Sequence, residues 1–213
     1  NTPIYEALGM SEISTYVSSG PNHAGHNDAS GYAQTGRRIA VLGRDATPVQ
    51  REDPGILAVS QDDPGLFLGY HNAPDETAAR FANGWFLTGD TVEMAQDGAI
   101  RYLGRDDDIM NAGGYRVSPL EVEQAFDAHP GISESAAVEL PVRAGVSVIG
   151  LFYVASEHPA TDAQLAQHAQ THLARYKQPR LFLRRETLPK GANNKLNRRA
   201  LRTGWKGNHD DQT

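Results

Sequence analysis

Cysteine is absent from the 213 residues of this sequence, positive charge is not in excess, and no apolar run is long. Without cysteine, disulfide bonds, thiolate metal sites and a cysteine nucleophile are excluded, and the chain suits a reducing compartment. No apolar stretch reaches the roughly 20 residues that a transmembrane helix needs. The formal net charge of -6 disfavours non-specific binding to nucleic acid or to an anionic membrane. We therefore expect a cytoplasmic protein that binds neither nucleic acid nor membrane.

The remaining composition is ordinary for a globular protein, with 39% hydrophobic and 22% charged residues. A chain of this length forms one large domain or two small ones. Its first residues, Asn1 to Tyr5, contain neither an initiator methionine nor the basic and then apolar segments of a secretory signal. We expect the chain to be a piece of a longer protein.

The first half of the sequence is predicted to be rich in strands and turns. Apolar runs at residues 38–42 and 56–59 are bounded by Gly, Pro and Asp, which favour turns. Residues 74–81 predict a short helix. Asp97 and Gly98 separate two extended runs, residues 91–94 and 99–103, and an Asp-Gly pair in that place is a strong signal for a β-hairpin.

The second half of the sequence alternates helical and extended patterns. Ser118, Pro119 and Glu121 predict a helix start, because serine caps, proline suits the first helical position and the glutamate completes a capping box. A second helix is predicted over residues 161–173, and strands over residues 136–140, 148–155 and 180–185. This alternation favours a small α+β domain. The polar end, residues 204–213, is predicted to be a flexible tail.

Four segments contain residue types suited to nucleotide chemistry, and the first two lie in the β-rich half. In residues 8–12, Gly9 allows the backbone to approach a ligand, Ser11 is suited to bind an anionic oxygen, and Glu12 to hold Mg²⁺. The alternative is a turn with a helix cap. In residues 84–90, Asp90 ends an apolar strand and is suited to accept hydroxyl protons from a sugar, the alternative being an ordinary turn aspartate.

The other two segments lie further along the chain. In residues 104–117, three adjacent carboxylates require solvent or cations, and Gly113-Gly114 before a capped helix indicates a backbone that approaches another group closely. The alternative is a solvated linker. In residues 188–199, a polar loop with Lys195 precedes a cationic run and is suited to bring an ammonium group to a phosphate. The alternative there is a basic surface tail.

Two further patterns are expected to form no site. His23 and His26 have the spacing of metal ligands, but they lie in a Gly- and Asn-rich segment without a further ligand pattern. Arg37 and Arg38 precede a strand and are expected at its solvated edge.

In this order and spacing, the four segments resemble the adenylate-forming superfamily, which includes acyl-CoA and aryl-CoA synthetases, peptide-synthetase adenylation domains and luciferases. Residues 69–77 and 176–179 match two more family segments, so the resemblance extends from Tyr5 to Leu201. It implies a ligase that uses ATP to form an acyl-AMP and then passes the acyl group to the thiol of coenzyme A. The implied fold class is α+β. Residues 1–104 would end a large AMP-binding N-terminal domain in a β-rich subdomain, residues 105–203 would form a small mobile C-terminal lid, and residues 204–213 a flexible tail.

The resemblance also implies roles for single residues in the first part of the chain. Ser11 would contact the phosphate or the acyl carboxylate, and Glu12 would bind Mg²⁺. The residues that would contact ATP or AMP are Gly9, Met10, Asp90 and Arg105, the last two through the ribose hydroxyls.

Further roles are implied for the lid. Asp107 aligns with the hinge about which the lid turns, and Lys195 with the lysine that bridges carboxylate and α-phosphate during adenylation. The residues implied for coenzyme A are Gly113 and Gly114, on the loop that lines the pantetheine channel, together with Arg116 and Lys177.

The sequence also departs from the family pattern. Leu8 stands where the family usually has tyrosine, and the family's Gly/Ser/Thr/Lys phosphate-binding loop is not in this sequence. We therefore expect this chain alone not to adenylate an acid and to need the upstream N-terminal segment of the same enzyme. Two alternatives stay open: an adenylation domain that loads a carrier protein, and a non-catalytic nucleotide- or protein-binding remnant. The residues do not identify the carboxylic acid substrate, and a homodimer is also left open.

Overall fold

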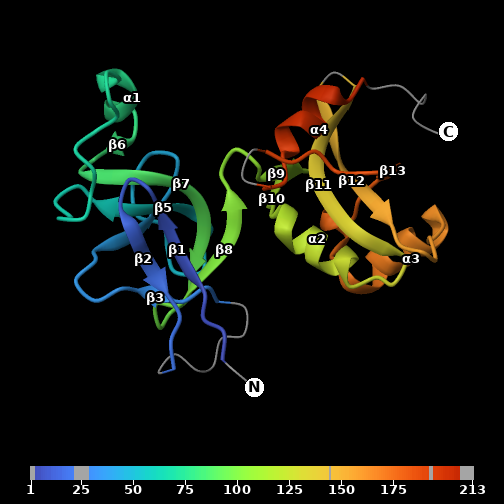
Figure 1. The fold of residues 1–213 in the computed structure, drawn as a ribbon, viewed down its shortest axis with the longest axis horizontal. Helices are drawn as coiled ribbons and strands as arrows, with labels where there is room; N and C mark the ends of the chain where they lie inside the picture. The colour runs from blue at the N-terminus through green and yellow to red at the C-terminus, as the bar shows by residue number, and fades with distance from the viewer. Residues whose placement is uncertain (1–2, 22–28, 144, 192–193, 207–213) are drawn as a thin grey trace. The chain divides into compact units, whose positions relative to one another are not determined.

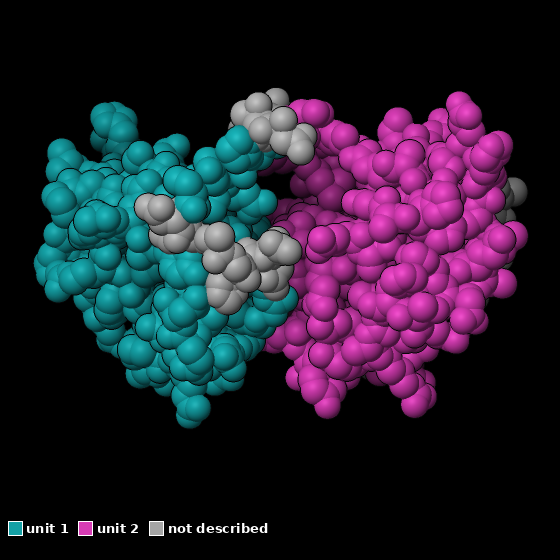
Figure 2. All heavy atoms as spheres, turned by 90° about the horizontal axis from the view of Figure 1, so that it is seen from below, with its two compact units in different colours: residues 1–107 teal, residues 108–213 magenta. Residues whose placement is uncertain are grey.

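The computed structural model describes residues 3–21, 29–143, 145–191 and 194–206. The chain divides into two compact units, residues 1–107 and 108–213, which are coloured separately in Figure 2. The division falls between Asp107 and Asp108, whereas the sequence pattern placed it after Gly104, because the last strand of the first unit continues through Arg105. The expected α+β fold class is confirmed.

The first unit is built from two antiparallel sheets (Figure 1). One sheet has the order β1-β2-β3, and the other has the order β4-β5-β7-β6 with β8 paired to β7. Their elements are β1 (Ala7–Met10), β2 (Ser14–Ser18), β3 (Tyr32–Ala33), β4 (Ile39–Leu42), β5 (Gly55–Ser60), α1 (Pro74–Ala78), β6 (Phe81–Ala82), β7 (Trp85–Met94) and β8 (Ile100–Arg105).

The two sheets share one hydrophobic core. Tyr16 and Val17 from β2 are fully buried against Val92 of β7 and Ile100 of β8. Because successive side chains on a strand point to opposite faces, β7 presents Val92 to the core while its other face remains available for polar groups. The core therefore fixes β2 against β7 and β8, the strands that carry the polar residues described below.

Several expected elements of the first unit are confirmed. Strands β4 and β5 lie where the apolar runs predicted them, and Asp97-Gly98 connects β7 to β8 as an antiparallel pair. The helix expected over residues 74–81 was too long, because α1 ends at Ala78 and Phe81 pairs with Phe86 in a strand. The hairpin formed by β1 and β2 was not predicted, since its strands are short and mix polar with apolar residues.

The second unit combines a three-stranded sheet of order β11-β12-β13 with a small hairpin and three α-helices. Strands β11 and β12 are antiparallel, and β12 and β13 are parallel. The elements are β9 (Met110–Ala112), β10 (Tyr115–Val117), α2 (Pro119–Asp127), β11 (Ile132–Arg143), β12 (Val146–Ala155), α3 (Asp162–His172), η1 (Arg175–Lys177), β13 (Leu181–Arg185) and α4 (Arg198–Gly204). None of the helices in the described residues is long and apolar enough to cross a membrane.

Both faces of the three-stranded sheet are buried. Ala137 of β11 and Leu151 of β12 pack in a cluster with residues of α2 and α3, whereas Val138 and Phe152 pack in another with Leu201 of α4. This alternation follows from the two-residue period of a strand. Helix α4 was not predicted and instead lay in a segment expected to be a loop and a cationic run. Trp205, in the expected tail, donates its indole N–H to the carbonyl of Pro141 at 3.0 Å.

The predicted helix starts are confirmed. The hydroxyl of Ser118 accepts a hydrogen bond from the backbone N–H of Glu121 at the start of α2. At the start of α3, Thr161 and Gln164 form a complete capping box. The carboxylate of Glu121, expected to complete a capping box, accepts a hydrogen bond from Nζ of Lys177 at 2.5 Å.

Candidate functional site

An irregularity in β7 determines how Asp90 is presented. Along β5 the pairing passes from Ala58–Leu87 to Ile56–Thr91, so β7 contains extra residues around Gly89. Gly89 has φ of +76°, a left-handed conformation that favours glycine. A β-bulge of this kind bends the strand and redirects its side chains. The absence of a side chain on Gly89 also makes room for Arg105, because a Cβ on Gly89 would lie 2.7 Å from Nη2 of Arg105.

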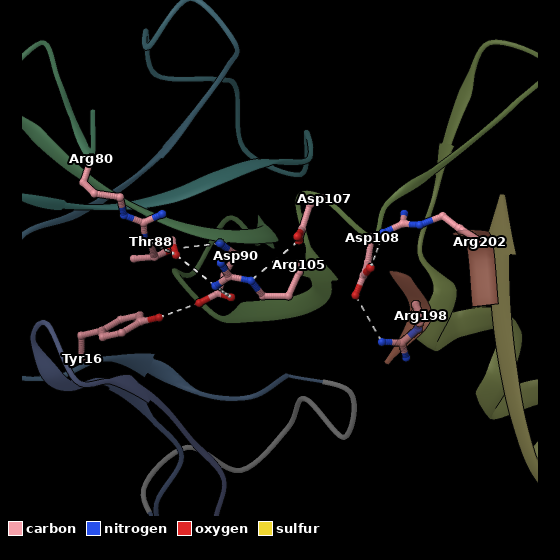
Figure 3. A network of polar contacts seen from close by, with 9 residues as sticks. All are labelled: Tyr16, Arg80, Thr88, Asp90, Arg105, Asp107, Asp108, Arg198 and Arg202. Carbon is pink, nitrogen blue, oxygen red and sulfur yellow. Dashed lines mark hydrogen bonds and ion pairs between the residues drawn. The ribbon is translucent and has the colours of Figure 1, made fainter. Parts of the chain in front are cut away.

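The carboxylate of Asp90 is held at both oxygens (Figure 3). The hydroxyl of Tyr16 donates to Oδ2 at 2.8 Å, and Nη1 of Arg105 donates to Oδ1 at 3.0 Å. The side chain of Asp90 is 13% exposed, while that of Arg105 is 43% exposed. A carboxylate oxygen has two acceptor positions, so each oxygen can still accept a further hydrogen bond from a ligand hydroxyl.

The surroundings keep these groups in defined charge states. Burial and the negative charge of Asp90 raise the pKa of the Tyr16 hydroxyl, so Tyr16 remains a neutral donor. Burial opposes the charge on Arg105, but Asp90 outweighs burial and the pKa of that guanidinium is raised. Arg105 also lies 4.0 Å from Asp107, measured between Nε and Oδ1. The expected pair of Asp90 and Arg105 is thus brought together.

Thr88 organises the backbone beside Asp90. Its hydroxyl donates to the carbonyl of Leu57 at 2.7 Å and accepts from the N–H of Asp90 at 3.1 Å. Its own carbonyl accepts from Nη2 of Arg80 at 2.9 Å and from Nη1 of Arg105 at 3.1 Å. No role was predicted for Tyr16, Thr88 or Arg80 from the sequence, because their relation to Asp90 arises from strand pairing and from contacts between distant segments.

Ser11 and Glu12 lie in the turn that joins β1 to β2, and no helix follows them. Ser11 is exposed and Glu12 is half-buried. Oε1 of Glu12 accepts a hydrogen bond from the hydroxyl of Tyr70 at 2.6 Å, and this hydrogen bond raises the pKa of Tyr70. The hydrogen bond from Tyr70 uses only one of the two oxygens of the Glu12 carboxylate. A single carboxylate fits a Mg²⁺ ion that takes its other ligands from phosphate and water.

Gly9 and Met10 lie at the end of β1, next to this turn. Gly9 is exposed, and the side chain of Met10 packs partly on the core. Arg37 stabilises the turn, because its Nη2 donates to the backbone carbonyls of Ile13 and Thr15, both at 3.3 Å. The expectation that Arg37 lies at a solvated edge is wrong, because its side chain is 18% exposed and pairs with Asp63, which is 2% exposed. Arg38 is 68% exposed.

In the second unit, a network of buried charges surrounds Arg198. This side chain donates to Glu123 at 2.6 and 3.0 Å and to Asp108 at 3.4 Å, and Arg202 donates to Asp108 at 3.1 Å. The contacts of Asp108 are drawn in Figure 3. Burial raises the pKa of Glu123, and Arg198 opposes that rise. The network joins the first residue of the second unit to helix α4, which directly follows the segment of Lys195.

Gly113 and Gly114 form the two-residue turn between β9 and β10. Their φ angles are +57° and +88°, as a tight hairpin turn of this length requires. A Cβ on either residue would meet no atom of the described chain within 4 Å. No described residue approaches this turn closely, and the left-handed backbone is itself a reason for glycine at both positions.

Aromatic and cationic side chains flank this hairpin. Tyr115 of β10 stacks on Tyr176 of η1 with ring centroids 4.5 Å apart, and Nζ of Lys177 lies 5.5 Å from the Tyr176 ring. Lys177 is fixed by Glu121 of α2, while Arg116 is half-buried on β10. The structure thus places Lys177 beside the hairpin that carries both glycines.

Lys195 lies in a short, internally bonded loop. Lys190 and Leu196 form a β-bridge, Gly191 donates its N–H to the carbonyl of Lys195 at 2.8 Å, and Asn194 has φ of +58°. The side chain of Lys195 is exposed and has no carboxylate partner among the described residues. The backbone is thus bonded at Gly191 and Lys195, while the side chain of Lys195 is exposed.

The expected site residues are divided between the two units. Asp90, Arg105 and Asp107 are linked in the first unit, which also contains Glu12, whereas Lys195 belongs to the second. Within residues 3–21, 29–143, 145–191 and 194–206, no three His, Cys, Asp or Glu side chains form a group that could hold a metal ion. His23 and His26 lie outside the described residues.

A row of histidines is packed on α3. The ring of His168 lies 4.0 Å from that of His172 and 4.8 Å from that of His129, between centroids, and Nε2 of His168 is 2.8 Å from the carbonyl of Ala125. Burial and His168 lower the pKa of His129 from its usual 6.5. The folded state thus disfavours the charged form of this side chain.

We predict a loss of stability below pH 6.5 that depends on His129. As the pH falls, His129 is protonated in the unfolded chain before it is protonated in the folded chain. The stability that depends on neutral His129 is therefore fully present above pH 6.5 and is lost as the pH falls to the folded-state pKa. Urea unfolding of the chain at pH 7.5 and 5.5 measures the effect. His129→Gln should reduce the difference between the two pH values, whereas His158→Gln, at an exposed histidine, should leave it unchanged. Equal pH dependence in all three proteins would contradict this account.

The sequence of this chain is similar to those of known enzymes over nearly its whole length. Residues 121–195 match the model of the AMP-binding enzyme C-terminal domain. The long-chain-fatty-acid–CoA ligase of Escherichia coli is 31% identical over 210 residues, which are 98% of this chain and 37% of that protein. The sulfoacetate–CoA ligase of Cupriavidus necator is 31% identical over 201 residues, covering 93% of this chain and 39% of that protein.

Solved structures are similar over nearly the whole chain. The o-succinylbenzoate CoA synthetase of Bacillus subtilis, in complex with its acyl-adenylate intermediate, has a TM-score of 0.86 at 27% identity, with 97% of this chain and 42% of that chain covered. ATP-bound MatB from Rhodopseudomonas palustris has a TM-score of 0.84 at 28% identity, with coverages of 95% and 41%. The chain thus spans well under half the length of the proteins it matches.

Proposed function

The chain belongs to the adenylate-forming superfamily and corresponds to the C-terminal portion of its acyl-CoA ligases, and from this premise we propose that the complete protein converts a carboxylic acid to an acyl-AMP and then to an acyl-CoA. The observation that carries the proposal is the arrangement at Asp90. A carboxylate held by Tyr16 and Arg105 is suited to accept hydrogen bonds from the two ribose hydroxyls of ATP and AMP.

The first half-reaction joins two anionic groups. The substrate carboxylate attacks the α-phosphate, a new C–O–P linkage forms, and pyrophosphate leaves. Two unit charges ~4 Å apart repel by about 4 kcal/mol at an effective dielectric constant near 20. In the proposed mechanism the ammonium of Lys195 offsets this repulsion by donating hydrogen bonds to the substrate carboxylate and to the α-phosphate. Ser11 donates a hydrogen bond to a phosphate or carboxylate oxygen. Mg²⁺ held by Glu12 would neutralise charge on the phosphates when bound.

The second half-reaction needs a different set of groups. The thiol of coenzyme A attacks the carbonyl carbon of the acyl-AMP, the thioester forms and AMP leaves. We propose that the lid then turns at Asp107, which withdraws Lys195 and brings Gly113 and Gly114 to the pantetheine channel. Support comes from the division of the chain after Asp107 and from the lack of side chains on the turn of the β9–β10 hairpin. Lys177 and Arg116 would contact the nucleotide part of coenzyme A.

The relatives favour coenzyme A over a carrier protein as the acceptor, because the curated proteins compared above are CoA ligases. They act on different acids by name, so the acid used by this protein is left to experiment. A carrier-protein enzyme would still release pyrophosphate but would form no thioester with free coenzyme A. Mass spectrometry of the products distinguishes the two.

The proposal is tested with the full-length protein, ATP, Mg²⁺, coenzyme A and a panel of carboxylic acids. The panel contains long-chain fatty acids, sulfoacetate, o-succinylbenzoate and anthranilate. Pyrophosphate release that depends on one acid, with formation of its CoA thioester, is the expected result. Parallel assays contain this chain alone and this chain mixed with the upstream segment, and we expect turnover only in the mixture. Failure of every acid to support pyrophosphate release would point to a nucleotide-binding remnant.

We predict that Gly114→Val impairs thioester formation more than adenylation. Valine disfavours φ of +88°, which costs roughly 1–2 kcal/mol, and its side chain would extend from a turn that is open here. A misplaced loop can slow a reaction ~10²-fold. Single-turnover assays of both half-reactions measure the effect.

Gly98→Val is the matched control for this prediction. Gly98 has φ of +91°, lies in the turn between β7 and β8, and also faces open space. It should cost similar stability without a selective effect on thioester formation. Equal losses in both half-reactions for Gly114→Val would assign the glycine to folding alone.

A further inference from the structure

Tyr16 is the second group that holds Asp90, and its position explains what it does. Tyr16 lies on β2, whereas Asp90 lies on β7, 74 residues later. The ring is fully buried in the core that β2 shares with β7 and β8, and the hydroxyl reaches Oδ2 of Asp90 at 2.8 Å. The core thus fixes the ring, and the ring fixes the hydroxyl that bonds to the carboxylate.

The two donors to Asp90 come from different elements and bond to different oxygens. Arg105 on β8 occupies Oδ1, and Tyr16 on β2 occupies Oδ2. A single donor leaves a carboxylate free to rotate about its terminal bond, where the rotamer preference is broad. Two donors at opposite oxygens fix the plane of the carboxylate and hence the direction of its remaining acceptor positions.

We propose that Tyr16 is a positioning residue for ribose recognition: its hydroxyl orients Asp90 so that both ribose hydroxyls of ATP are bound in the ground state. The inference rests on the proposed function. Because Tyr16 acts through Asp90, its loss weakens binding of the ribose hydroxyls and leaves the reacting groups, Lys195 among them, unchanged. The effect therefore falls on KM for ATP and not on kcat.

The test compares ATP with 2′,3′-dideoxy-ATP in the full-length protein, using acid-dependent pyrophosphate release. Tyr16→Phe keeps the buried ring and removes the hydroxyl. We expect KM for ATP to rise about tenfold, because a hydrogen bond to a charged group is lost, and kcat to change less than about twofold. KM for 2′,3′-dideoxy-ATP should stay within about twofold, since that nucleotide offers Asp90 no hydroxyl. A purely structural role of Tyr16 would raise KM for both nucleotides equally, which would overturn the inference.

Two further variants make the result specific. Tyr32→Phe removes a tyrosine hydroxyl that donates to Asp97 at 2.9 Å at an exposed position, and it should change neither KM nor kcat. Replacement of Tyr16 by 4-aminophenylalanine retains a donor in the same place and should restore most of the affinity for ATP. If Tyr16→Phe does not fold, this substitution still decides the question, because its weaker donor should raise KM for ATP by less than about tenfold and leave KM for 2′,3′-dideoxy-ATP unchanged. Equal rises in KM for the two nucleotides would then overturn the inference.

Asp90→Ala distinguishes failure of this inference from failure of the proposed function. Suppose that Asp90→Ala raises KM for ATP but not for 2′,3′-dideoxy-ATP, while Tyr16→Phe changes neither KM. In that case Asp90 binds ribose without help from Tyr16, and only the inference fails. If Asp90→Ala does not discriminate between the nucleotides, the proposed role of Asp90 in ribose binding fails as well.

Discussion

Replacing Lys195 by alanine should lower the rate of acyl-adenylate formation in the full-length protein by about 10²–10³-fold, the loss typical of removing one preorganised group that stabilises the transition state. The reason is electrostatic, since Lys195 supplies the positive charge between two anionic reactants. The thioester half-reaction, started from a supplied acyl-adenylate and coenzyme A, should keep its rate within about twofold, because the proposed lid movement removes Lys195 before that step.

The matched control for Lys195→Ala lies in the same loop. Lys190 forms the β-bridge with Leu196, and its Nζ pairs with Glu134 at 2.8 Å. Lys190→Ala should leave both half-reactions within about twofold of the unchanged protein. Because the side chain of Lys195 is exposed, the alanine variant should unfold at the same urea concentration. Full adenylation activity in Lys195→Ala, or an equal loss in both half-reactions, would remove Lys195 from the proposed mechanism.

Arg198→Gln should destabilise the second unit more than any surface change, by about 3–5 kcal/mol. The guanidinium is 13% exposed, and its removal leaves the carboxylates of Glu123 and Asp108, 8% and 17% exposed, without their shared cation. Arg202 still pairs with Asp108, so most of the loss should arise at Glu123. Urea unfolding at pH 7.5, followed by the fluorescence of Trp205 in a Trp85→Phe background, reports on the second unit.

Two comparisons make the Arg198 prediction specific. Arg199→Gln changes the neighbouring exposed residue and should cost less than ~0.5 kcal/mol. Adding Glu123→Gln to Arg198→Gln should restore part of the stability, because the buried negative charge is then removed along with its partner. A loss below ~1 kcal/mol for Arg198→Gln would mean that water solvates the two carboxylates. Helix α4 would then not depend on this network for its position.

The Arg198 network also bears on the hinge proposed at Asp107. Asp108 directly follows Asp107, where the two units divide, and the network joins it to α4, which directly follows the Lys195 segment. A rotation at Asp107 would therefore move the start of the second unit and the Lys195 loop together. We expect Arg198→Gln to lower adenylation beyond its effect on the thioester step, because the lysine loop loses that support.

The elements that the sequence predicted well have strong local signals. Ser118 and Thr161 cap their helices because a hydroxyl before a helix satisfies free N–H groups within the same segment. The Asp97-Gly98 hairpin follows from a short turn that needs left-handed backbone at Gly98, which has φ of +91°. In contrast, helix α4 contains several arginines and only one buried leucine, so its pattern resembled a charged surface segment.

The candidate site was predicted only in part, because only some of its residues lie in sequence motifs. Asp90 and Arg105 were identified through their place in family motifs, and strand pairing brings them within hydrogen-bonding distance. Tyr16 and Thr88 carried no motif, because their role depends on which distant residues they contact. Arg37 was misjudged from its neighbour Arg38, since only the fold places a buried Asp63 beside it.

The sequence by itself determined the kinds of groups available and the order in which they occur: carboxylates at the ends of strands, a glycine pair in a turn, and ammonium groups on a polar loop. These follow from local chemistry, which needs no knowledge of distant segments. Only the tertiary structure decided which partners those groups have. Packing between residues far apart in the chain brings the hydroxyl of Tyr16 to the carboxylate of Asp90. The same kind of packing buries Glu123 and Asp108 around Arg198. Sequence periodicity carries no information about such pairs, because each arises when two apolar faces are buried against each other.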